Sequence, residues 1–100
     1  MRRYLGIIND HNDIDSYKES MANYASRVNM EIDVVIISDT MLFQDFLQVN
    51  YNKYCRVIFY DYEEFVNFNQ FRDILEITQE HNLELSIIKQ DLHFAGHRVV

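Results

Sequence analysis

The sequence predicts one α/β domain, built on a parallel sheet with helices packed on both faces. Apolar runs of strand length alternate with stretches of helical periodicity. Most of the apolar runs are continuous rather than alternating, as expected of strands buried on both faces. A length of 100 residues with 48% hydrophobic residues suits one domain with an ordinary core. We therefore expect residues 1–100 to form a single domain.

Four apolar runs are the predicted strands. They are Tyr4–Ile8, Ile32–Ile37, Val57–Tyr60 and Leu83–Ile88. In the fourth run Leu85 and Ile87 alternate with polar residues. Because alternation is typical of a strand with one side facing solvent, we expect this strand at the edge of the sheet. The remaining residues, 91–100, follow as a tail, and the sequence leaves open whether it is ordered or extended.

Three segments between the strands place apolar residues at helical spacing. They run from Ile14 to Val28, from Leu42 to Leu47 and from Phe68 to Thr78. Asp13 is the predicted N-cap of the first helix, and Ser38 or Asp39 that of the second. Asn82 is predicted to end the third helix, because asparagine readily adopts the left-handed conformation found there.

The alternation of strands and helices also predicts the topology. Crossovers between parallel strands are right-handed, and helices on both faces require the chain to reverse direction once. We therefore expect a three-layer α/β/α arrangement with a four-stranded parallel sheet in the order 2-1-3-4.

Polar residues gather where this topology predicts a ligand crevice, beyond the carboxyl ends of the first and third strands. The candidate crevice residues are Asn9, Asp10, Asp13, Asp39, Asp61, Glu63 and Glu64. One interpretation is a Mg²⁺ site held by Asp10 and Asp61, since hard cations take oxygen ligands. The other is structural, with aspartates capping a helix and glutamates in a first helical turn. We favour the second and expect no cofactor. The loops contain no basic residue, so a cation or a basic partner would relieve their repulsion.

Composition disfavours several functions. A net charge of −7, with the basic residues scattered, opposes direct DNA binding by the isolated chain. The turn at residues 9–12 lacks glycine, so it offers no phosphate cradle, and no serine lies in a Gly-x-Ser-x-Gly turn. A single cysteine, Cys55, and the lack of a secretory leader predict a cytoplasmic protein. No apolar run is long enough to span a bilayer.

Four segments match the pattern of a known family. Arg3–Ile8 forms an opening strand, Glu19–Ala25 ends in Tyr-Ala, Asn29–Ile32 leads into the second strand, and Leu85–Phe94 covers the fourth strand and its turn. In these segments the chain resembles the N-terminal domain of serine recombinases, the resolvase and invertase family. The resemblance implies a resolvase-like or flavodoxin-like fold and a link to site-specific DNA recombination and mobile elements.

The residues that carry out the chemistry of that family are missing here. The family places an arginine and, two residues later, its nucleophilic serine at the end of the first strand, where this chain has residues 7–10 with neither. After the third strand, the phosphate-binding arginines are replaced by Glu63, Glu64 and Asn67. A carboxylate repels the phosphodiester that an arginine would stabilise. The resemblance therefore implies a catalytically inactive pseudoenzyme.

A second, weaker resemblance is to response-regulator receiver domains. Asn9–Asn12 is similar to the acidic pair that follows their first strand, and Asp61 is similar to their phosphoacceptor. The sequence departs from that family in two ways: Asn9 replaces one acid, and the predicted sheet ends before a fifth strand and its lysine.

Two functional hypotheses follow. The leading one is a non-enzymatic protein interaction or regulatory module that associates with itself or with another protein. Its predicted contact surface is the edge formed by Leu85 and Ile87 together with Leu92 and Phe94 of the tail. The alternative is a receiver-like domain that binds a cation or accepts a phosphoryl group.

Overall fold

A computed structural model describes residues 2–38 and 40–96, and the side chains of 40–42 lie outside that description. The strands are β1 (Arg3–Asn9), β2 (Ile32–Ile37), β3 (Tyr54–Phe59), β4 (Glu84–Ile87) and β5 (Leu92–Phe94). The helices are α1 (Ile14–Ser26), α2 (Thr40–Asn50) and α3 (Phe68–Glu80), with short 3-10 turns η1 (Tyr51–Lys53) and η2 (Tyr62–Glu64). The predicted α/β class is confirmed.

The sheet has the order β2-β1-β3-β4-β5, so its first four strands are parallel and lie in the predicted order. The prediction of four strands is wrong, because β5 pairs antiparallel with β4. The chain reverses there through Asp91, whose φ of 52° allows a tight turn. Part of the predicted tail 91–100 is therefore a strand.

This fifth strand also overturns the prediction that β4 is the edge. Leu85 and Ile87 are both completely buried, so they cannot line a contact surface in the folded chain. Ser86, expected to face solvent, is completely buried as well. Ser86 can be buried in β4 because its hydroxyl has hydrogen-bonding partners in Tyr24, Arg56 and His93.

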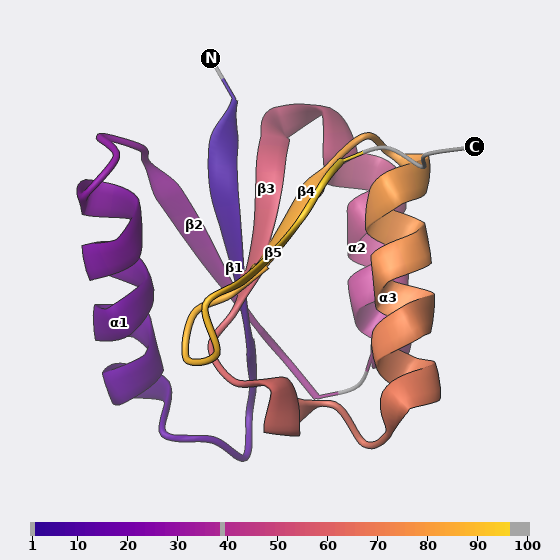
Figure 1. Ribbon diagram of the computed structural model, residues 1–100, viewed down its shortest axis with the longest axis horizontal. Coiled ribbons are helices and arrows are strands. Elements are labelled where there is room, and N and C mark those ends of the chain that lie inside the picture. The colour runs from indigo at the N-terminus through magenta and orange to yellow at the C-terminus, as the bar shows by residue number, and fades with distance from the viewer. Residues whose placement is uncertain (1, 39, 97–100) are drawn as a thin grey trace.

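Helices cover both faces of the sheet (Figure 1). The residues of α1 pack with one hydrophobic cluster, in which Met21 and Ala25 meet Tyr4, Ile8 and Ile58 of the sheet. At Gly6 the helix approaches β1 closely, since a Cβ there would lie 2.6 Å from the sulfur of Met21. The helices α2 and α3 pack with the second, larger cluster on the opposite face.

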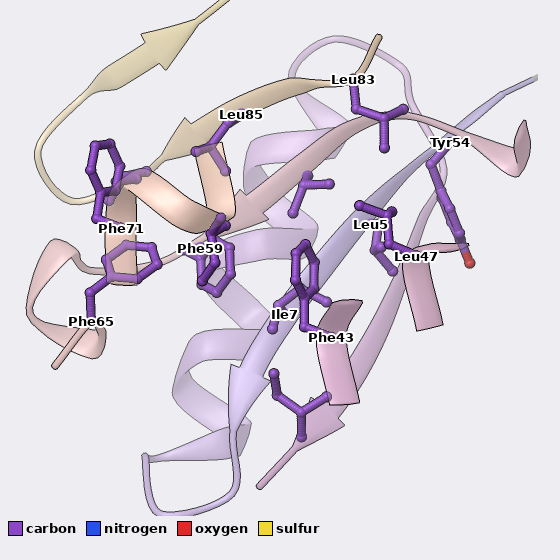
Figure 2. Packing of buried hydrophobic residues seen from close by; sticks show 14 residues of the cluster. Leu5, Ile7, Phe43, Leu47, Tyr54, Phe59, Phe65, Phe71, Leu83 and Leu85 are labelled. Atoms are coloured by element: carbon purple, nitrogen blue, oxygen red, sulfur yellow. The ribbon is translucent and has the colours of Figure 1, made fainter. Parts of the chain in front are cut away.

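Aromatic rings make up much of the larger cluster (Figure 2). Phe59 lies with its ring centre 6.0 Å from that of Phe43 and 4.9 Å from that of Phe65. Phe65 in turn meets Phe71 of α3 at 5.3 Å in an edge-to-face arrangement. Phe65 belongs to the loop after β3, so these contacts fix that loop and the polar residues in it.

Two of the predicted helix ends are confirmed. The Asp13 side chain accepts a hydrogen bond from the Ser16 N–H at the start of α1. At the end of α3, Asn82 has a φ of 57°, in the left-handed region. Asp39, a predicted cap of α2, lies outside the described residues.

Candidate functional site

The carboxyl ends of β1 and β3 bring only part of the predicted crevice together. A small cavity of about 190 Å³ lies there. It is lined by His11, Asn12, Tyr17, Asp61, Glu63 and Glu64. Asn9 is buried, whereas Asp10 and Asp13 are exposed and do not line the cavity. Asp39, also predicted here, lies outside the described residues.

Asp61 is a buried carboxylate whose two oxygens both have partners. Its Oδ1 accepts hydrogen bonds from the Glu63 N–H at 3.0 Å and from the Gln90 side chain at 2.8 Å. Its Oδ2 accepts one from the Lys89 ammonium group at 3.2 Å. Burial alone would raise the pKa of Asp61, but these hydrogen bonds outweigh it and hold the pKa below its usual value.

Glu64 is the second acidic side chain whose oxygens accept hydrogen bonds from within the chain. Its Oε2 accepts the backbone N–H groups of Tyr60 and Asp61 at 3.0 and 2.9 Å, and its Oε1 accepts from the Asn12 side chain at 3.1 Å. Asp61 and Glu64 thereby form a capping box around η2. Burial raises the pKa of Glu64, despite the opposing effect of these hydrogen bonds.

The geometry fits the structural interpretation of these acids better than the Mg²⁺ interpretation. Asp61 has donors on both oxygens, and the Asp10 side chain is 57% exposed, with its Oδ1 3.9 Å from Nδ1 of His11. Among the described residues, no three His, Cys, Asp or Glu side chains are arranged to hold a metal ion. The oxygens of Asp61 are thus bonded within the chain, whereas the Asp10 side chain is exposed.

Lys89 is a residue of this site that the sequence did not predict. The loops after β1 and β3 were expected to repel one another for want of a basic residue, and that expectation is wrong. Lys89 follows β4, next to β3 in the sheet, and pairs with Asp61. The spatial order of the strands could have revealed this pair, because it places the residues after β4 beside those after β3.

A second polar cluster, also missed, lies on the α1 side of the sheet. Arg56 donates to the Tyr24 hydroxyl at 2.9 Å and to the Ser86 hydroxyl at 2.8 Å, and it pairs with Glu84. Ser86 also contacts a ring nitrogen of His93 at 2.9 Å. This cluster joins β3, β4 and β5 to α1 and explains how a serine is buried in the sheet.

The cluster has the residue types of a hydrolytic triad but not the accessibility. His93 lies 2.8 Å from Asp91 through its other nitrogen, which completes a Ser-His-Asp chain. A nucleophile must reach a substrate, and Ser86 is completely buried. Its oxygen is also already bonded by Arg56 and Tyr24. These contacts hold β5 on β4.

Cys55 is half-buried, and its sulfur lies 3.7 Å from the Arg3 carbonyl oxygen. Burial raises the pKa of the Cys55 thiol, which keeps it in the less reactive protonated form.

Of the predicted contact residues in the tail, Leu92 is 37% exposed and Phe94 is partly buried against the core. More exposed apolar side chains lie elsewhere in the described chain. They are Val28, Ile36, Val49, Tyr51, Val66 and Phe68.

The chain matches no family model, no curated protein and no solved structure. None of the helices in the described ranges has the length and apolar character that crossing a bilayer requires.

Proposed function

We propose that this chain is a non-enzymatic interaction or regulatory module, with a resolvase-like fold, that associates with a second copy of itself. The observation that carries the non-enzymatic part of the proposal is that the two Asp61 oxygens receive three hydrogen bonds from within the chain. Because the oxygens of Asp61 already accept hydrogen bonds from within the chain, this acid stabilises the fold. Its oxygens have little remaining capacity to bind a ligand.

The residues around this crevice also support the loss of recombinase chemistry. Arg56 and Ser86 are an arginine and a serine in contact, but they bond to each other beside Tyr24 on the α1 side of the sheet. Neither lines the cavity beside Asp61. A phosphodiester in that cavity would meet carboxylates, which repel it.

Two measurements test the proposal. Light scattering over a concentration series reports self-association, and a strictly monomeric chain at about 1 mM would remove that part. Backbone amide spectra recorded during a MgCl₂ titration report on the crevice, and the proposal expects no selective shifts there. The exposed Asp45 carboxylate on α2, which does not line the cavity, provides an internal reference for weak, non-specific binding.

The alternative, a receiver-like cation-binding or phosphoacceptor domain, has one observation in its favour. A lysine reaches the acid after β3, with Lys89 Nζ 3.2 Å from Asp61, although the sequence placed no lysine there. The same MgCl₂ titration distinguishes the two functions. Shifts confined to residues 9–13 and 61–64 would support the receiver-like function and contradict the interaction module.

A further inference from the structure

The two edges of the sheet differ in how well they are protected. The β5 edge has three residues, and the charged Asp91 precedes it. The β2 edge has six residues, Ile32–Ile37, and within the described ranges it pairs with β1 alone. Natural edge strands are usually protected by being short, by proline, by lysine or by a bulge. The β2 strand has six residues, no proline and no lysine, and the register shift in this part of the sheet lies between β1 and β3; its one charged residue is Asp33.

The hydrogen-bonding groups of β2 alternate in direction. Tyr4 N–H donates to the Glu31 carbonyl and Asp10 N–H donates to the Ile37 carbonyl, so the odd-numbered residues of β2 face β1. The N–H and C=O groups of Ile32, Val34 and Ile36 therefore point away from the sheet. Within the described chain no hydrogen bond reaches these groups. Three donors and three acceptors are thus available in one row.

We propose that two copies of this chain associate through β2, with the strands antiparallel and Val34 opposite the second copy's Val34. This inference rests on the self-association proposed above and adds the surface. A two-fold axis perpendicular to the joined sheet keeps the α1 sides of both copies on one face. Residues that share a face then lie opposite one another. The residue that lies on the two-fold axis, opposite its own copy, is therefore Val34 or one of its neighbours.

The Val34 register uses every available group. Ile32 lies opposite Ile36 and Val34 opposite Val34, so the three outward residues of each copy exchange six main-chain hydrogen bonds. A register centred on Val35 would place Ile32 opposite Ser38, which lies outside the strand. Only four main-chain hydrogen bonds would then form between the two strands. The Val34 register also covers Ile36, which is 47% exposed in the single chain.

The one charged residue of β2 does not oppose this pairing. Asp33 lies opposite Val35 in the Val34 register, so the two aspartates do not face each other. Within its own chain Asp33 pairs with Arg3 at 2.7 Å and accepts from the Tyr54 hydroxyl at 3.0 Å. The remaining opposition is the net charge of −7 on each copy. Because salt screens this repulsion, dimerisation should strengthen as ionic strength rises.

Light scattering and amide hydrogen exchange on the full chain test the surface. We expect the average mass to rise toward that of a dimer as the concentration approaches about 1 mM, as suits a small interface. Over the same range, exchange at the amides of Ile32, Val34 and Ile36 should slow in proportion to the fraction of chain left as monomer, about twofold when half of it is dimeric. Ile36→Lys should abolish both changes. Val49→Lys, at a 78% exposed position on α2, adds the same charge and should abolish neither.

Each outcome separates this inference from the proposed function. A dimer that persists in Ile36→Lys, or a dimer without slowed exchange at the three amides, overturns the β2 surface and leaves the interaction module standing. A chain that stays monomeric overturns the inference and the self-association together. Selective Mg²⁺ shifts around Asp61 overturn the interaction module, while the β2 measurements still decide the inference.

Discussion

The crevice around Asp61 and the edge of β2 use their hydrogen-bonding capacity in opposite ways. In the crevice, Asp61 and Glu64 are ionisable side chains whose oxygens are bonded within the fold. At the edge, Ile32, Val34 and Ile36 have apolar side chains, but their main-chain groups have no partner in the described chain. The comparison shows that ionisable side chains can serve the fold alone. A strand with apolar side chains, by contrast, can still offer its main-chain N–H and C=O groups for hydrogen bonding.

The largest effect should come from Asp61, on the structural side of this comparison. Asp61→Asn removes the charge that Lys89 and two N–H donors stabilise, and we expect a loss of about 2–3 kcal/mol in the free energy of unfolding at pH 7. Asp10→Asn, at an exposed carboxylate, should change it by less than about 0.5 kcal/mol. Urea unfolding of both variants measures the difference, and equal stabilities would show that Asp61 is not structural.

The effect of Asp61→Asn should also depend on pH in one direction. Because the folded-state pKa of Asp61 is lowered, its ionised form stabilises the fold at pH values above its ordinary pKa. This stabilisation is lost as pH falls through the lowered folded pKa. Unfolding free energies of the natural chain and of Asp61→Asn should therefore converge in acid, and a gap that widens there would contradict the assignment.

A smaller effect is expected at Ser86, the buried hub beside β5. Ser86→Ala leaves Arg56 and His93 without one partner each and should cost about 1–2 kcal/mol. Ser26→Ala, at an exposed position at the end of α1, is the matched control and should be nearly neutral. Thermal unfolding measures both. A neutral Ser86→Ala would mean that the polar cluster does not hold β5 in place.

Much of the fold could be predicted because its signals are local. The apolar runs and cap residues such as Asp13 and Asn82 act within a few residues of themselves. The fifth strand could not be predicted this way. It depends on a left-handed turn at Asp91, which is not a glycine, and on contacts that β5 makes across β4. Three residues of strand carry too little periodicity to be recognised in sequence.

The site was harder to predict, because proximity to a strand end does not reveal which groups will meet. Asp10 and Asp61 follow neighbouring strands, yet one is exposed and the other buried. The partners of Asp61 come from Lys89 and Gln90, 28 and 29 residues further along the chain. The unpaired hydrogen-bonding groups at the β2 edge could not be predicted from the sequence for a related reason. These groups belong to the backbone, so no residue type marks them.

Glu64→Gln should lower the free energy of unfolding by less than Asp61→Asn or Ser86→Ala does. The amide can keep the bonds from Tyr60 and Asp61, but its NH₂ group cannot accept from Asn12, so we expect a loss of about 1 kcal/mol or less. The raised pKa of Glu64 means that its ionisation opposes folding as pH rises through that value. The deficit of Glu64→Gln should therefore shrink between acid and neutral pH in urea unfolding. A growing deficit would contradict the raised pKa.

The smallest effect on stability is expected at the open edge. Ile36 is 47% exposed and directs its N–H and C=O groups away from β1, so Ile36→Lys removes no ladder hydrogen bond. At concentrations low enough for a monomer, its unfolding free energy should lie within about 0.5 kcal/mol of the natural value. A larger loss would mean that Ile36 belongs to the core of the single chain, which would remove the contrast with Asp61. If the unfolding free energy stays within that range, the folded monomer is unchanged. Any loss of dimer mass in Ile36→Lys is then due to the β2 edge.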